Sequence, residues 1–426
     1  MICSQLSHNN GEKVDYAPHR ITVLMLLFPF LLTAQNTEQS SWIKLNGYVR
    51  HDLFFDNREN VTALNGLFLL FPTQESKLAD GKDSNANPSL TMLAITSRLN
   101  TTFQTPCVLN AKVSGRIEGD FTLYSGASGF RLRHAYGQLA WEKTKLLAGQ
   151  TWIPAFVENC IPTVVGLATG APYQEFARNP QIRLTHQLRK MELLAAVVSQ
   201  MDYASPGPDG ASPVYMRRAV VPEIDLGASF GNTHWLIGLL GSVKTLKPRH
   251  FAYGEGNSEL INTSETLTTF SIKGYAKYYR EKWALKAAAT FGENMSENLM
   301  QGGYAVSKRD SLTGKEQYTP SSGIYSWLNF VYGEKWKGSF TVCYGYNFGF
   351  DKPVYNHNLI WGRGLEIEKM YRIVPSVFYN IGKFQLVLEY ELNTAYYGKL
   401  NFDSGRVENA NPVTNHRVML ATSFFF

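Results

Sequence analysis

The chain has 426 residues, of which 18% are charged and 13% aromatic, and its formal net charge is +6. The charged fraction is below the roughly 25% of ordinary globular domains, and low charge with many aromatic residues argues against a disordered chain. The longest nearly apolar run, residues 21–32, is too short for a membrane-spanning helix, which needs about 20 residues. What remains is a large globular protein or a β-barrel.

The apolar run lies where a secretory signal is expected. His19 and Arg20 precede it, and Leu32-Thr33-Ala34 ends it on small residues. A charged flank, a short apolar stretch and small residues are typical of a signal peptide cleaved after Ala34 or Gln35. The alternative is a buried first strand or helix. We expect a signal peptide over residues 1–34 and one domain over residues 35–426.

Three cysteines remain after the expected cleavage: Cys107, Cys160 and Cys343. Their spacing is wide and no Cys/His cluster occurs, so no metal site is expected. A bridge between Cys107 and Cys160 is conceivable, but the sequence does not establish it.

The remaining sequence repeatedly alternates polar and apolar residues. Between Val108 and Phe121, even-numbered positions from 112 to 120 are polar, whereas odd-numbered positions from 113 to 121 are apolar or glycine. The same period of two recurs over residues 336–348, 384–393 and 418–426. This period predicts β-strands with two different faces. Strands of 10–15 residues fit a tilted crossing of a bilayer better than a soluble sandwich, whose strands have about 5–6 residues.

Short and long connections alternate along the chain. The expected tight turns lie at 105–106, 142–144, 189–190, 231–232, 281–282, 334–335 and 382–383. The expected long loops lie at 54–89, 122–129, 152–175, 202–215, 246–263, 294–318, 351–369 and 398–411. This rhythm predicts an all-β fold, a single transmembrane antiparallel barrel of about 16 strands with short periplasmic turns and long extracellular loops. An aromatic girdle beside the turns is expected from Trp42, Trp141, Trp235, Trp283, Trp336 and Phe384.

If the apolar face meets lipid, the polar face lines a lumen that sixteen strands make wide enough for water. The inward positions expected to form a basic wall are Arg50, Arg98, Lys112, Arg116, Arg131, Arg133, Arg183, Arg372 and Arg417, with Glu118 and Asp120 among them. Other sectors carry acids: Glu192, Glu223, Asp225, Glu389 and Glu391. Guanidinium groups hold carboxylates and phosphates weakly enough for release, so the wall favours anions. Alternatively, the arginines pair with the acids and only stiffen the wall.

The third long connection, residues 152–175, is poor in charge. Glu158 and Glu175 are its charged residues, and several prolines and glycines lie among them. Such a loop suits a position inside the barrel, where it narrows the pore. Packing against a neighbouring protomer is the alternative.

Several segments together resemble a known family. Ser97-Arg98-Leu99, residues 116–121, residues 131–136, residues 149–152 and residues 178–183 occur in this order. As a set they resemble the DcaP-like porins of Gram-negative outer membranes, and the match covers about residues 96–187. The resemblance implies a trimeric, sixteen-stranded porin that favours small anions such as dicarboxylates. It also implies that Arg98, Arg116, Arg131, Arg133 and Arg183 correspond to the family's basic wall. One departure is expected, because only residues 36–41 separate the cleavage site from the first strand, whereas some members carry a coiled-coil segment there.

The expected function is therefore passive diffusion of small hydrophilic, anionic solutes through an outer-membrane porin. No enzymatic activity and no cofactor are expected, since the nine histidines occur in no G-x-S-x-G or H-E-x-x-H setting. The expected partners are outer-membrane lipid, the solutes and two further copies of the chain, but no nucleic acid. The alternatives are a plugged structural or adhesin-type barrel and, less favoured, an outer-membrane hydrolase.

Overall fold

The computed structural model describes residues 41–122, 128–166, 170–254 and 259–426. The expected signal peptide lies outside the described residues, and so does most of the expected loop at 122–129. All that follows concerns the unit Gln39–Phe426. In the described part of the chain, no helix is long and apolar enough to cross a membrane.

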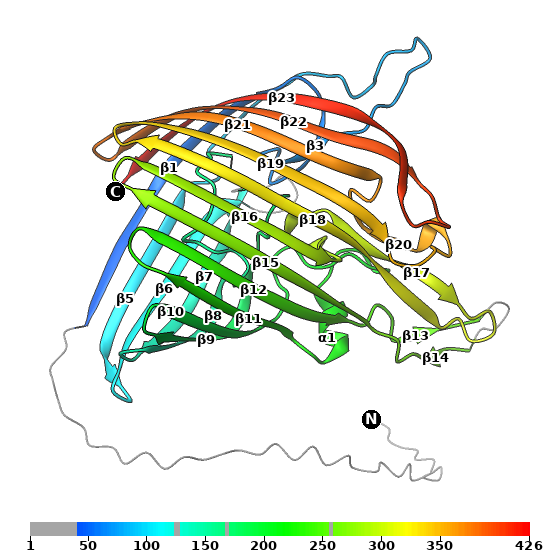
Figure 1. Cartoon of the computed structure of the whole chain (residues 1–426), viewed down its shortest axis with the longest axis horizontal. Coiled ribbons are helices and arrows are strands. Elements are labelled where there is room, and N and C mark those ends of the chain that lie inside the picture. Colours follow the sequence, from blue (N-terminus) through cyan, green and yellow to red (C-terminus); the bar gives the residue numbers. More distant parts are fainter. Residues whose placement is uncertain (1–40, 123–127, 167–169, 255–258) are drawn as a thin grey trace, which may run out of the picture. The chain divides into compact units, whose positions relative to one another are not determined.

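Nineteen strands form one antiparallel sheet, and sixteen of them close into a barrel (Figure 1). Closure follows because β1 pairs with β23 along one edge and with β5 along the other. The barrel strands are β1 (Trp42–Asp56), β5 (Arg98–Val108), β6 (Ala111–Thr122), β7 (Ser128–Ala140), β8 (Thr144–Trp152), β9 (Arg178–Leu188), β10 (Met191–Val198), β11 (Glu223–Gly231), β12 (Trp235–Leu246), β15 (Leu267–Arg280), β16 (Trp283–Glu293), β18 (Glu316–Gly333), β19 (Trp336–Phe350), β21 (Ile367–Ile381), β22 (Phe384–Leu400) and β23 (Val407–Phe425). The expected strand number and class of fold are confirmed.

The other elements lie in the long connections. Three strands extend the main sheet, namely β4 (Ser89–Leu93), β17 (Gly302–Arg309) and β20 (Ile360–Arg363). Two small hairpins are β2 (Asn60–Ala63) with β3 (Phe68–Pro72), and β13 (Phe251–Ala252) with β14 (Ile261–Asn262). The short helix α1 (Val214–Ala219) and 3-10 turns at Glu297–Leu299 and His357–Leu359 complete the loops.

The tight turns lie at one end of the barrel, but the first differs from the expectation. Strand β5 runs through Thr105 and Pro106 and ends at Val108, so the turn is Leu109-Asn110. Proline lacks an N–H for the ladder, and the pairing shifts register between Thr105 and Val108. The chain reverses two residues later, where Leu109 and Asn110 both have positive φ.

The two faces of the strands differ as the alternation predicted. On β23, Val418, Leu420 and Phe424 are exposed by 39–55%, whereas Arg417 and Met419, which point to the other face, are fully buried. The aromatic residues expected beside the turns are all at least partly exposed. This surface suits contact with lipid.

Aromatic rings cover glycines on that outer face, which gives a test of the packing. An added Cβ at Gly115 of β6 would lie 2.2 Å from the Phe103 ring and 2.7 Å from the Tyr136 carbonyl oxygen. We expect Gly115→Ala to lower the free energy of unfolding by about 1–3 kcal/mol, because overpacking forces neighbours to move. Urea unfolding in detergent measures this. Gly137→Ala is the matched control, because its Cβ would meet nothing within 4 Å; equal stability of the two variants would contradict the packing.

Candidate functional site

The described residues of the connection between β8 and β9, 153–166 and 170–177 and hereafter the lumen loop, lie inside the barrel. On one side, Lys273 of β15 donates to the Ala155 carbonyl (2.8 Å) and pairs with Glu175 (2.6 Å). Lys286 of β16 donates to the Ile161 carbonyl at 2.7 Å. These contacts fix the beginning and end of the loop against the β15–β16 wall.

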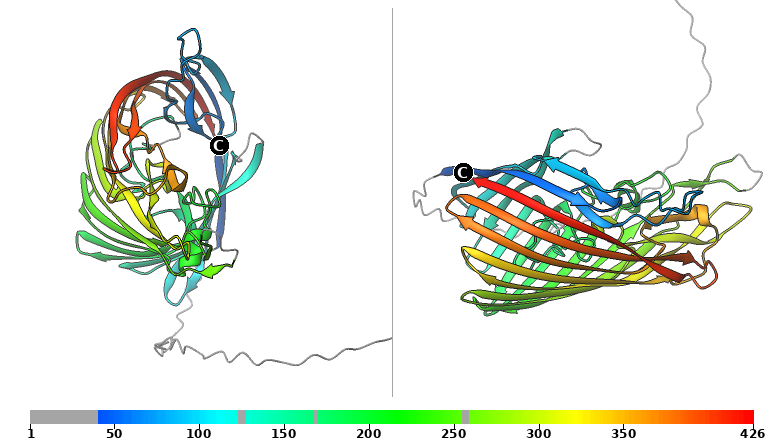
Figure 2. Two further views of the ribbon diagram at one scale, coloured as in Figure 1. Left: turned by 90° about the vertical axis from the view of Figure 1, so that its right-hand side faces the viewer. Right: turned by 90° about the horizontal axis from the view of Figure 1, so that it is seen from above.

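The same loop also reaches the opposite wall. Glu389 of β22 accepts hydrogen bonds from the backbone N–H groups of Val165 and Gly166, both at 2.7 Å. Arg50 of β1 donates to the Val165 carbonyl at 2.7 Å. Residues bound to β1, β15, β16 and β22 must cross the interior, and Figure 2 shows loop segments inside the ring of strands.

An apolar core fills part of the interior toward the long loops. The Trp152 ring stacks on Phe156 at 3.8 Å and meets Phe176 edge-on at 4.8 Å. Phe68, from the first long connection, meets Phe176 at 5.0 Å. Residues 67–71 of this first loop are 0–3% exposed. Two loops therefore pack on each other within the barrel and narrow it.

Arg417 and Arg372 point inward, as the alternation predicted, but they anchor loops and do not face open water. Arg417 is 0% exposed, pairs with Asp56 at 2.7 Å and donates to the Gly66 carbonyl at 2.8 Å. Arg372 donates to the carbonyls of Leu69, Leu70 and Ala171.

The anchoring role of Arg417 can be tested by substitution. Arg417→Met leaves the buried Asp56 carboxylate without its charged partner and with only the Asn415 amide bound to it, and breaking a buried pair in this way costs about 3–5 kcal/mol. We therefore expect a clear loss in the free energy of unfolding, measured by urea titration in detergent. Arg406→Met removes an exposed arginine from the loop before the same strand and should be close to neutral. An Arg417 variant as stable as the Arg406 variant would contradict the anchoring role.

Strands β6 and β7 carry the densest group of charges. Arg133 bridges Glu118 (2.7 Å) and Asp120 (2.8 Å), and Arg131 binds Asp120 through two nitrogens at 3.0 and 3.1 Å. Arg133 is 3% exposed, and Glu118 and Asp120 are equally buried. This inner part of the group is a closed network.

Two further arginines form its outer part. Arg116 donates to Glu118 and to the Asn100 side chain, and Arg98 approaches Glu118 at 3.7 Å. Their side chains are 28% and 21% exposed. Four guanidinium groups thus face two carboxylates, which leaves a net positive charge. Together these six residues are called the arginine cluster.

A β-bulge shapes the cluster. The β6–β7 register steps from Glu118↔His134 to Gly119↔Leu132, so no residue of β6 pairs with the backbone of Arg133 across the two strands. Because the extra residue breaks the alternation, Arg133 and His134 are both buried. The His134 ring contacts the Thr151 hydroxyl at 2.9 Å through Nδ1. Simple alternation placed only Arg131 and Arg133 inward.

A cavity of about 190 Å³ lies beside the cluster. Arg98, Arg131, Trp152, Phe156 and Glu158 are among the residues that line it. Arg98 Nε is buried and has no hydrogen-bond partner within the described residues. Unpaired buried donors are costly, so this cavity is suited to an acceptor such as an anion or water.

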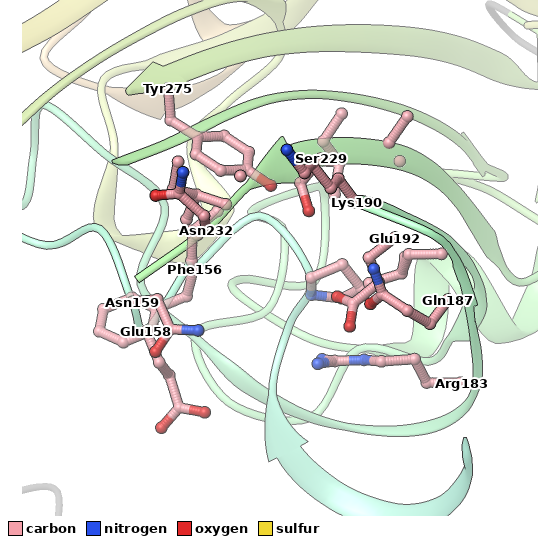
Figure 3. A pocket seen from close by; sticks show the side chains of 18 residues that line it. Phe156, Glu158, Asn159, Arg183, Gln187, Lys190, Glu192, Ser229, Asn232 and Tyr275 are labelled. Carbon is pink, nitrogen blue, oxygen red and sulfur yellow. The ribbon is translucent and has the colours of Figure 1, made fainter. Parts of the chain in front are cut away.

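A second cavity, of about 350 Å³, lies toward the tight turns (Figure 3). Its charged lining residues are Glu158, Arg183, Lys190 and Glu192. Arg183 is held by the Gln181 side chain at 2.9 Å and by the Trp152 carbonyl. Phe156 and Glu158 line both cavities, so the two lie on either side of this part of the lumen loop.

The remaining expected site residues lie apart from these cavities. Lys112 is exposed near the turn end of β6, Arg50 pairs with Asp52 at 2.7 Å, and Glu175 is paired with Lys273. The inward lysines of β15 and β16 were not expected, although the alternation on those strands indicates them.

Other side chains that reach the interior were not predicted from the sequence either. Arg178, at 1% exposure, binds Asp202 at 2.7 Å and lies over the Trp152 ring. The Cys160 thiol donates to the Ala276 carbonyl at 3.2 Å, and no disulfide joins cysteines among the described residues. Within the same residues no group of three or more His, Cys, Asp and Glu could hold a metal ion.

A closed sixteen-stranded barrel with short turns at one end and a loop folded into its lumen is the architecture of a porin-type channel. The chain shares the fold of the outer-membrane channel DcaP of Acinetobacter baumannii, with a TM-score of 0.65, 17% identity and coverage of 93% of this chain and 100% of that one. The chain also shares the fold of OmpT, an outer membrane protein of Vibrio cholerae solved in a trimer form. The TM-score is 0.55, the identity is 10%, and the match covers 91% of this chain and 100% of that one. The comparison with Salmonella typhi OmpF in complex with daunomycin has a TM-score of 0.52 and 10% identity, and it covers 90% of this chain and 97% of that one. No protein-family model and no curated protein matches this sequence.

Proposed function

We propose that this chain is an outer-membrane porin that lets small hydrophilic solutes diffuse passively and prefers anions such as dicarboxylates. It reaches the membrane through a cleaved signal peptide, needs no cofactor and catalyses no reaction. A homotrimer is part of the proposal, supported by the trimer form of the Vibrio cholerae protein with the same fold.

The arginine cluster with its cavity is the observation that carries this proposal. Excess guanidinium charge, and a buried N–H group of Arg98 without a partner, lie beside a cavity in the lumen. Fixed positive charge in a narrow aqueous space raises the local concentration of anions. Weak, incompletely satisfied donors let the anion leave again.

The two cavities together suggest a route. Because the apolar core occupies part of the interior, we place the route along the β5–β11 wall, from the arginine cluster past Phe156 and Glu158 to Arg183 and Lys190. Arg50, Arg372 and Arg417 then hold the loops that border this route, whereas Arg98, Arg116 and Arg183 act on the solute.

The proposal is tested with proteoliposomes that contain the purified, folded protein. Swelling in an isosmotic solution of succinate should be faster than in a neutral sugar of similar size, because the lumen carries excess positive charge. Equal rates would contradict the anion preference, and no swelling with any solute would contradict the porin.

A plugged structural barrel is the second candidate, because the two inward loops fill part of the lumen with apolar side chains. It predicts no swelling in the same assay.

A further inference from the structure

The turn-side cavity differs chemically from the arginine cluster. Two carboxylates, Glu158 and Glu192, and two cations, Arg183 and Lys190, line it. None of these four forms an ion pair with another described residue within 4 Å. In the arginine cluster, by contrast, every carboxylate is bound by guanidinium groups.

Unpaired charges of both signs in one cavity can bind both ends of a dipolar solute. Arg183 and Glu158 both line the cavity, and Figure 3 shows that they come from different elements, β9 and the lumen loop. Tyr275, Asn159 and Asn232 add neutral polar groups to the lining. A volume of about 350 Å³ is within the range of small-molecule sites.

We infer that the turn-side cavity is a second solute subsite that accepts zwitterions such as amino acids, and that Glu158 confers this preference. The ammonium group of the solute lies toward Glu158 and its carboxylate toward Arg183. This inference rests on the proposed function, since it assigns a substrate class to one end of the same route.

The position of Glu158 explains why this residue controls which solutes pass. It lines both cavities, so every solute on the proposed route passes it. The barrel encloses its side chain, but water reaches it, and it accepts no hydrogen bond from the described residues, so its charge is available to a solute. Glu175, the other lumen-loop carboxylate, is neutralised by Lys273.

A dianion and a zwitterion of similar length respond to Glu158 with opposite sign. Succinate carries two carboxylates, both repelled by Glu158, whereas 4-aminobutyrate has an ammonium group that Glu158 attracts. Removing this one charge should therefore change the ratio of their fluxes more than either flux alone.

Protonation of the Glu158 carboxylate should have the same effect as removing its charge by substitution. Burial raises the pKa of the Glu158 carboxyl, while Arg116 and Arg183 oppose the rise and Glu118 adds to it. Glu158 should therefore lose its charge at a higher pH than an ordinary carboxyl group, so acidification from neutral pH should increase chloride preference in a KCl gradient, and the Glu158→Gln variant should lose part of this response. The charged groups that face Glu158 are Arg98, Arg116, Glu118, Asp120, Arg131, Arg133, Arg183, Lys190 and Glu192.

The test compares fluxes of 4-aminobutyrate and succinate into proteoliposomes containing wild type, Glu158→Gln or Glu142→Gln. Glu142 is exposed in the turn between β7 and β8 and does not line the cavity, so it is the matched loss of charge. We expect Glu158→Gln to lower the flux ratio of 4-aminobutyrate to succinate by about threefold or more, and Glu142→Gln to leave it unchanged.

The outcomes separate the two proposals. If wild type passes both solutes and Glu158→Gln keeps the wild-type ratio, the zwitterion subsite is wrong while the porin stands. If wild type passes neither solute, the porin itself is wrong. The Glu158 substitution preserves shape and breaks no ion pair with the described residues, so loss of folding is not expected to obscure the result.

Discussion

Replacing Glu389 by alanine is expected to give a noisier and more conductive channel. This carboxylate is 1% exposed and accepts the N–H groups of Val165 and Gly166, which lie far along the lumen loop. Losing the acceptor leaves two buried N–H groups unpaired, at a cost of about 1–3 kcal/mol each. The loop then leaves the β22 wall for part of the time, and the open cross-section fluctuates.

Single-channel recording in a planar bilayer measures this effect as added current noise and a higher mean conductance. Glu334→Ala, in the exposed turn between β18 and β19, removes the same side chain without touching the loop. A quiet Glu389→Ala channel with wild-type conductance would mean that the loop does not depend on this contact.

Replacing Arg133 by methionine is expected to destabilise the barrel rather than to change its selectivity alone. Arg133 is shared by Glu118 and Asp120, and all three are at most 3% exposed. Breaking a buried pair by removing one partner costs about 3–5 kcal/mol, because the remaining charge stays out of water. Here two carboxylates lose a partner, although Arg116 and Arg131 still bind them.

This loss is measured as a lower free energy of unfolding in urea and as a lower unfolding temperature in detergent. The matched control is Arg98→Gln with Arg116→Gln, because these side chains are 21% and 28% exposed and lie at the outer part of the cluster. If the double variant is as unstable as Arg133→Met, the division into an inner structural part and an outer solute-facing part is wrong.

The strands, and the face to which each side chain points, could be predicted because the alternation of polar and apolar residues depends only on neighbouring positions in the sequence. A strand residue such as Arg417 must point inward if Val418 points outward, whatever surrounds the strand. The sequence does not reveal what stands opposite Arg417 inside the barrel, which is the Gly66 carbonyl, about 350 positions away in the chain. Thus the alternation placed Arg372 and Arg417 correctly as inward residues, yet their partners depend on loops whose path is set by long-range contacts.

Local irregularities account for the other differences. The bulge beside Arg133 turns His134 inward as well, and one extra residue leaves almost no trace in the alternation. Pro106 signals a turn in the sequence, but here it only disturbs a strand that continues to Val108. The sequence left the charge-poor lumen loop two positions, inside the barrel or against a neighbouring protomer, and its contacts with β1, β15 and β22 place it inside.

The reversal potential of the wild-type channel in a KCl gradient tests the central claim most directly. An excess of guanidinium groups around the route predicts preference for chloride, and Arg98→Gln with Arg116→Gln should shift the reversal potential toward zero without closing the channel. A cation-selective wild-type channel, or a purified and folded barrel that carries no current, would contradict this account.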